Sequence, residues 1–162
     1  MVLEQSGDRE GLLAWCRRWT AAEASSADAW FALGTAYSLL GRSSAAIDSY
    51  RRTVRLDPRH LDAWFNLGLT YGRLGRHRDA IRALRRTLEI DPADAEAWSQ
   101  LGLAYLAAGN RESARAVAAE LAGLDPERAA DLRRRAGLDP PPADSHRHPA
   151  GVQGVAPGRA AP

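Results

Sequence analysis

One pattern of residues recurs every 34 positions through most of this 162-residue chain. Its largest member is tryptophan, found at Trp30, Trp64 and Trp98. Identical residues that recur three times at one fixed period do not arise from composition alone, so the pattern predicts stacked supersecondary units. The same period relates six more sets: Leu33, Leu67 and Leu101; Gly34, Gly68 and Gly102; Tyr37, Tyr71 and Tyr105; Gly41, Gly75 and Gly109; Ala46, Ala80 and Ala114; Pro58, Pro92 and Pro126.

Each unit is predicted to contain two helices. Trp30, Leu33 and Tyr37 lie at i, i+3 and i+7, which is the spacing of one helix face. Gly41 follows where a left-handed C-cap is expected, and a second amphipathic segment comes next. Pro58 ends that segment because proline lacks an N–H and disfavours helix in the residue before it. The fold class is therefore all-α, built from units of helix, turn, helix and stop.

The glycine after the repeated leucine falls inside the first helix of each unit, where it costs roughly 1 kcal/mol relative to alanine. We interpret this cost as the result of a close approach between the two helices of a unit. On this interpretation the facing small residues are Ala46, Ala80 and Ala114. The repeated tryptophans would then supply the burial that holds each unit to its neighbour.

The sequence Trp-x2-Leu-Gly-x2-Tyr, followed by Ala and Pro on a 34-residue period, resembles the tetratricopeptide repeat (TPR) of bacterial arrays. The resemblance implies a solenoid of antiparallel helix pairs wound as a right-handed superhelix. It departs from the family pattern late in the second helix. The position that Tyr50 occupies in the first unit is occupied by Leu84 and Ala118 in the two later units. On this register the chain divides into a partial N-terminal repeat (1–26), three repeats (27–60, 61–94 and 95–128), a capping helix (127–138) and a disordered tail (139–162).

The period also extends toward the N-terminus. Gly7 aligns with the C-cap glycines, so residues 8–22 are expected to form the second helix of an earlier repeat. The first helix of that repeat would begin before Met1. Either the chain is a piece of a longer protein, or Trp15 and Trp19, four residues apart, shield the open face.

At the other end, Leu132 stands in the tryptophan position. Residues 127–136 carry arginines near their end and are followed by Gly137, as expected for a helix that caps the stack and keeps it soluble. From Asp139 on, Pro, Gly, Ala and His dominate, so we expect a disordered tail. His146 and His148 in that tail are too few to predict a metal site.

Composition and motifs narrow the possible functions. The single cysteine, Cys16, rules out an internal disulfide, and the register aligns it with a core position rather than with a reactive site. No P-loop, G-x-S-x-G or H-E-x-x-H motif occurs, so we predict no enzyme activity, cofactor or metal. No apolar segment is long enough to suggest a membrane span, and no signal peptide is evident, so a cytoplasmic protein without membrane contact is expected.

Arginine pairs recur on the predicted second helices. One interpretation is a stripe that binds phosphates. We favour the other, a solvated face with local partners such as Asp48 and Glu89, and therefore expect no nucleic-acid binding. The pairs are Arg17-Arg18, Arg51-Arg52 and Arg85-Arg86.

In TPR proteins a stripe on the concave side of the first helices lines a peptide groove, and the resemblance carries that role to this chain. Its centre would be apolar and its rim acidic, which favours a peptide with hydrophobic anchors and a basic flank. The alternative is that Phe31, Phe65 and the leucines only pack neighbouring first helices. The candidate residues are Asp28, Phe31 and Thr35 in the first repeat, Asp62, Phe65, Asn66, Leu69 and Arg73 in the second, and Glu96, Ser99 and Leu103 in the third.

One TPR subclass grips the C-terminal carboxylates of heat-shock chaperones with Lys, Asn and Arg. In this chain the corresponding positions hold Phe31, Thr35, Asn66, Glu96 and Gln100. Only Asn66 matches, and Glu96 would repel a carboxylate, so we expect no binding of this kind.

The sequence thus favours a noncatalytic protein–protein interaction module or scaffold whose rigid groove binds a peptide or protein segment. Two alternatives remain. The chain could be the C-terminal accessory or regulatory TPR region of a larger enzyme, such as a serine-protease–TPR protein, an analogy that no residue here supports. It could also be a homo-oligomerisation module that self-associates through its N-terminal face.

Overall fold

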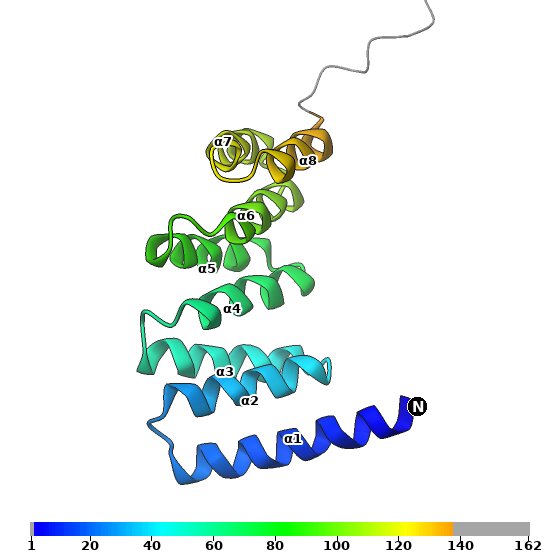
Figure 1. Ribbon diagram of the computed structural model, residues 1–162, viewed down its shortest axis with the longest axis vertical. Coiled ribbons are helices and arrows are strands. Elements are labelled where there is room, and N and C mark those ends of the chain that lie inside the picture. The colour runs from blue at the N-terminus through cyan, green and yellow to red at the C-terminus, as the bar shows by residue number, and fades with distance from the viewer. Residues whose placement is uncertain (1, 138–162) are drawn as a thin grey trace, which may run out of the picture.

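The computed structural model describes residues 2–137, with side chains from residue 8 onward. This part of the chain is entirely helical, and its helices stack one after another along a single axis (Figure 1). The expected all-α solenoid is therefore confirmed. The helices are α1 (Val2–Ala22), α2 (Ala27–Leu39), α3 (Ser43–Leu56), α4 (Leu61–Arg73), α5 (His77–Ile90), α6 (Ala95–Ala107), α7 (Arg111–Ala122) and α8 (Pro126–Ala136).

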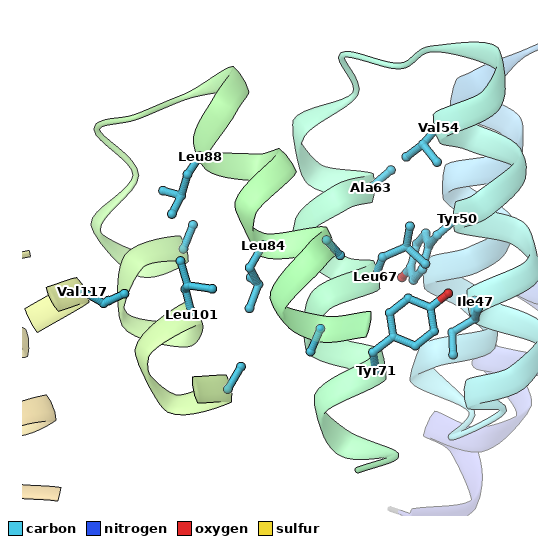
Figure 2. Packing of buried hydrophobic residues seen from close by; sticks show 14 of the residues in the cluster. Ile47, Tyr50, Val54, Ala63, Leu67, Tyr71, Leu84, Leu88, Leu101 and Val117 are labelled. Atoms are coloured by element: carbon cyan, nitrogen blue, oxygen red, sulfur yellow. The ribbon is translucent and has the colours of Figure 1, made fainter. Parts of the chain in front are cut away.

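A continuous apolar core runs along the stack from α3 to α8. Figure 2 shows Leu67 and Tyr71 of α4 lying beside Ile47 and Tyr50 of α3. Side chains of consecutive units therefore pack against one another across the boundary between the units. A smaller cluster joins α1 to α2 and contains Cys16, which is completely buried. Burial raises the pKa of the Cys16 thiol, which keeps it protonated. The prediction that Cys16 is a core residue is confirmed.

Local hydrogen bonds define where the first helices begin and end. Gly75 ends α4 with a φ of 70°, a left-handed conformation that glycine adopts without strain, as predicted. The Arg76 amide then donates to the Tyr71 carbonyl at 2.9 Å and turns the chain back toward α5. At the N-termini of α2, α4 and α6, the side chains of Ser26, His60 and Asp94 accept hydrogen bonds from the amides three residues later.

The repeated tryptophans have a different role from the one expected. Each is only partly buried, so none is the fully enclosed anchor that the sequence suggested. Each indole N–H donates to the main-chain carbonyl six residues earlier and fastens the helix to the loop before it. The bonds join Trp30 to Ala24, Trp64 to Pro58 and Trp98 to Pro92, with N–O distances of 2.9, 3.0 and 2.9 Å.

The interior glycines do make room for a neighbour, but that neighbour is not the repeated alanine. A Cβ on Gly34 would lie 2.6 Å from the Tyr50 ring, and one on Gly68 would lie 2.6 Å from Leu84 Cγ. Real Cβ atoms do not approach other atoms so closely. Glycine is therefore needed because a large side chain of the second helix lies directly on the backbone of the first.

The expected break at Gly7 is wrong. Helix α1 runs without interruption from Val2 to Ala22 and passes through this glycine. At Gly41, by contrast, the chain turns because α3 folds back against α2. Continuing the helix through Gly7 adds one backbone hydrogen bond per residue.

Helix α8 departs from the period. A further 34 residues from the start of α6 would place the next helix at residue 129, but α8 begins at Pro126. The reason is local: Arg128 occupies the position of the capping residues His60 and Asp94 and cannot cap. Instead, the Asp125 carboxylate accepts the Arg128 amide at 3.0 Å and starts the helix there.

This early start brings α8 against α6. A Cβ on Gly102 would lie 2.2 Å from Leu132, so Leu132 fills the space that Tyr50 and Leu84 fill in the earlier repeats. The equivalent residue of α7, Ala118, is too short to do so. Arg128 also forms an ion pair with Glu96 of α6. Gly137 ends α8 with a φ of 65°, as expected for the cap, and the predicted disordered tail with His146 and His148 lies outside the described residues.

We predict that Gly68→Ala lowers the free energy of unfolding by about 1–2 kcal/mol, because the new methyl overlaps Leu84 in a packed core. Gly72→Ala in the same helix is the matched control. No atom lies within 4 Å of a Cβ built there, so it should stabilise by about 0.5 kcal/mol through helix propensity. Urea unfolding followed by circular dichroism measures both, and an equal gain in the two variants would contradict the close contact.

We also predict that α8 is held by packing more than by charge. Leu132→Ala should cost about 2–5 kcal/mol, because Leu132 is 2% exposed and covers Gly102. Arg128→Ala should cost less than about 1 kcal/mol, since the Arg128 and Glu96 side chains are 43% and 44% exposed. The same unfolding experiment compares them, and a larger loss for Arg128→Ala would overturn this ranking.

Candidate functional site

A cleft of about 520 Å³ opens along the first helices. We call it the first-helix groove. Its floor includes Gly68, Ala80 and Leu84, the residues of the close contact between α4 and α5. Its remaining lining residues are Ser38 of α2; Asn66, Leu69, Thr70, Gly72 and Arg73 of α4; His77 of α5; and Gln100, Leu103, Ala104 and Ala107 of α6.

Helical spacing decides which residues of α4 face this groove. Asn66, Thr70 and Arg73 lie at i, i+4 and i+7 and therefore share one side of the helix. The repeated Trp64, Leu67 and Tyr71 lie on the other side, out of the groove. The tryptophan, leucine and tyrosine of the motif thus lie outside this groove, whereas its Gly68 and Ala80 contribute to the floor.

The structure brings four of the predicted peptide-binding residues together in the first-helix groove. Two are polar, Asn66 and Arg73, and two are apolar, Leu69 and Leu103. The other seven do not line it: Asp28, Phe31, Thr35, Asp62, Phe65, Glu96 and Ser99.

Phe31 is engaged in packing between units. Its ring centroid lies 5.8 Å from that of Tyr50 and 4.7 Å from that of His60, which begins the next repeat's first helix. Phe65 is likewise partly buried against the core. Both residues therefore contribute to packing within the stack. Thr35 donates its hydroxyl to the Phe31 carbonyl at 3.1 Å, a bond within its own helix.

The expected acidic rim lies apart from the groove. Glu96 is paired with Arg128 and also accepts a hydrogen bond from Gln100 at 2.8 Å. Asp28 and Asp62 are exposed on the first turns of their helices. Asp62 precedes Arg73 by eleven residues of α4, which corresponds to about 16 Å along the axis. The acidic residues and the one arginine of the groove therefore lie at opposite ends of the first helices.

Arg73 is held in place by neighbouring hydroxyls. Its Nη2 donates to Ser38 Oγ at 2.9 Å and to Thr70 Oγ1 at 3.3 Å, so the side chain spans from α4 to α2. Beside it, burial raises the pKa of the Tyr50 phenol, against the opposing effects of hydrogen bonds with Thr35 and Ser38 and of the Arg73 charge. Arg73 thus presents a positive charge in a fixed position at one end of the groove.

Several groove residues were missed by the sequence analysis. Thr70 lies four residues after Asn66, so helical spacing could have indicated it. Gln100 corresponds to a clamp position of the chaperone-binding subclass, and it was not predicted to line the groove. His77 belongs to the start of a second helix, and no pattern on the first helices points to it.

The described residues contain no group of three His, Cys, Asp or Glu side chains placed to hold a metal ion. Among the helices of residues 2–137, none combines the length and the apolar character that crossing a membrane requires. Of the local partners expected for the arginine pairs, Glu89 forms an ion pair with Arg86. In the described part of the chain, Asp48 forms none with Arg51 or Arg52.

Solved structures of other proteins share this fold. MamA from Desulfovibrio magneticus RS-1 (residue 41 to its end) has a TM-score of 0.73 at 24% identity, over 83% of this chain and 79% of that one. YrrB, described as a TPR protein with an unusual peptide-binding site, has a TM-score of 0.70 at 22% identity, over 85% and 74%. The first TPR of Spaghetti (RPAP3), bound to the HSP90 peptide SRMEEVD, has a TM-score of 0.64 at 23% identity, over 68% and 90%.

Sequence comparison identifies the repeat directly. One family model of the tetratricopeptide repeat matches residues 27–60, and a second matches residues 65–129. No curated protein gives a significant match. The two matched ranges together cover more than half of the 162 residues. The chain therefore belongs to the tetratricopeptide repeat family.

Proposed function

We propose that this chain is a noncatalytic interaction module that docks a protein or peptide segment in the first-helix groove. The observation that carries the proposal is the groove itself, formed before any partner binds, with apolar and hydrogen-bonding side chains from consecutive repeats. A rigid groove of this kind lowers the cost of ordering an extended partner. Two proteins of the same fold support it by their descriptions, one bound to a peptide and one with a peptide-binding site.

The lining indicates how a segment would be held. Leu69 and Leu103, from neighbouring first helices, would receive apolar side chains of the partner. Asn66 and Gln100 would bond its main-chain amides, and Arg73 would attract a carboxylate or carbonyl at one end. Two exposed candidates on the first turns, Asp28 and Asp62, would contact a longer segment beyond the groove, together with the half-buried Ser99. The remaining candidates would support them from within the fold: Phe31, Thr35, Phe65 and Glu96.

This arrangement differs from a clamp for chaperone C-termini. The chain has no lysine, and Glu96 stands at one of the clamp positions. Asn66, the matching residue, donates its side-chain amide to the Asp62 carbonyl at 2.9 Å. We therefore propose a partner that is recognised by apolar anchors rather than by its terminal carboxylate.

We predict that Leu69→Ala/Leu103→Ala reduces capture of the partner at least about tenfold, because each truncation removes apolar contact area in the groove. The measurement is affinity capture with the whole chain, followed by quantitative mass spectrometry. Leu39→Ala/Leu74→Ala is the matched control, since these leucines are 47% and 45% exposed outside the groove. A partner retained equally by all three proteins would refute binding in this groove.

Self-association is a second candidate function, favoured by the outer face of α1. Leu12 and Trp15 are 40% and 50% exposed there, and the Trp15 and Trp19 rings contact each other in a tilted arrangement with their centroids 5.1 Å apart. Large apolar side chains gathered on an open face are typical of interaction surfaces. The partner in this case would be a second copy of the chain.

We predict that the mass of the protein in static light scattering rises with concentration, and that Leu12→Glu/Trp15→Glu abolishes the rise by charging this face. Leu39→Glu/Leu74→Glu serves as the control, because it places the same charges on exposed leucines elsewhere. A monomer mass at every concentration, or a rise that the α1 variant leaves intact, would exclude self-association through α1.

A further inference from the structure

A second groove lies on the opposite side of α4. We call it the second-helix groove, because α3 and α5 form its walls and α4 forms its floor; its volume is about 420 Å³. The floor residues Trp64, Leu67 and Tyr71 share the face of α4 that points away from the first-helix groove. The two grooves are therefore separate surfaces, and a residue change in one leaves the lining of the other intact.

Four arginines line the walls of the second-helix groove. Arg51 and Arg55 lie four residues apart on α3, and Arg82 and Arg86 lie four residues apart on α5. Like charges at this spacing repel one another on a helix, and here two such pairs border the same groove. An anion lying between the walls would relieve this repulsion.

The acidic residues around the groove are already occupied. Asp79 accepts hydrogen bonds from Arg82 and, at 2.8 Å, from Arg76, and these bonds lower the pKa of its carboxyl group. Glu89 is paired with Arg86. Arg51 and Arg55 form no ion pair with any residue of the described chain, so positive charge remains in excess on the α3 wall.

The floor of the groove is apolar and partly open. Trp64 is half-buried, and its indole N–H is already bonded to the Pro58 carbonyl, so its exposed ring offers apolar surface alone. Val54 and Leu67 are buried beside it. Arg76 stacks over the Tyr71 ring, with its guanidinium carbon 4.6 Å from the ring centroid, and is thereby held at the edge of the floor.

The excess of arginines is largest in this groove, where four arginines stand against the single Asp79. The corresponding cleft over α6 has one arginine and one glutamate on its walls, Arg85 and Glu89. The lining of the cleft over α2 contains Arg52 and Arg55 beside one acidic residue, Asp48, and Arg55 borders both clefts. A nucleic-acid backbone needs a continuous basic track, whereas a short acidic peptide needs one basic site with an apolar centre.

We infer that the second-helix groove docks an acidic protein segment that carries an apolar side chain between its carboxylates. The carboxylates would pair with Arg51 and Arg55, whose guanidinium groups present paired donors, and the apolar side chain would rest on Trp64. This surface is independent of the first-helix groove. It would let one chain hold two different segments at once, on opposite sides of the same helix.

The test uses a fluorescein-labelled peptide with a Leu-Phe pair flanked on both sides by glutamates, titrated with the full chain and followed by fluorescence anisotropy. We expect saturable binding that weakens about tenfold in Arg51→Gln/Arg55→Gln, since two exposed charge pairs are lost. Arg111→Gln/Arg115→Gln is the matched control. It removes two exposed arginines at the same spacing on α7 and should leave the dissociation constant unchanged. Circular dichroism verifies that both variants are folded.

Three further measurements test whether the peptide needs both its apolar and its acidic side chains, and whether it binds at Trp64 rather than in the first-helix groove. Two control peptides, one with Ala in place of both Leu and Phe and one with Gln in place of Glu, should each bind at least about tenfold more weakly. In a ¹H–¹⁵N spectrum, assigned with Trp64→Phe, the Trp64 indole signal should shift on binding. Leu69→Ala/Leu103→Ala should leave this binding intact, which distinguishes it from the groove of the proposed function.

The inference is overturned if the Arg51/Arg55 variant binds the peptide as tightly as the unchanged protein, or if the Trp64 signal does not move. It is also overturned if a single-stranded RNA of equal charge binds as tightly as the peptide with the same dependence on these arginines, because the site would then recognise phosphates without an apolar anchor.

Discussion

The structure depends on the contact between a glycine of each first helix and a large side chain packed directly on its backbone. Tyr50 on Gly34, Leu84 on Gly68 and Leu132 on Gly102 leave no room for even one methyl group. Because the core is close-packed, this contact fixes how near the helices approach and how they are oriented. In the third repeat the side chain of α7 is too short, and the filling residue comes from α8 instead, which sets the position of the end of the stack.

The same contact divides each first helix into two functional sides. With one side of α4 turned toward the second helices, Asn66, Leu69 and Arg73 remain for the first-helix groove. The repeated Trp64 and Tyr71 line the opposite groove, where the arginines of α3 and α5 gather. The repeat motif therefore specifies the scaffold and, in this chain, also provides an apolar floor for a second surface.

Helix boundaries follow from short-range hydrogen bonds, and one changed residue is enough to move a helix. His60 and Asp94 cap α4 and α6, but Arg128 at the next equivalent position has no acceptor to offer. The Asp125 side chain caps α8 instead, so the helix begins earlier. As a result Arg128 forms an ion pair with Glu96, so the negative charge of this expected rim residue is compensated within the chain. Asp28 and Asp62 lie on the first turns of their helices, so the predicted rim is apart from the observed groove.

The sequence by itself determined the class of fold, the period, the C-cap glycines and the burial of Cys16, because each of these depends on local conformation or on a regular spacing of apolar residues. It also named four residues of the first-helix groove. Only the tertiary structure decided what covers each glycine, that Phe31 packs on Tyr50 and His60, and that Arg51, Arg55, Arg82 and Arg86 border one groove. These contacts join residues of different helices, and their existence depends on distances and angles between helices that no repeat period encodes.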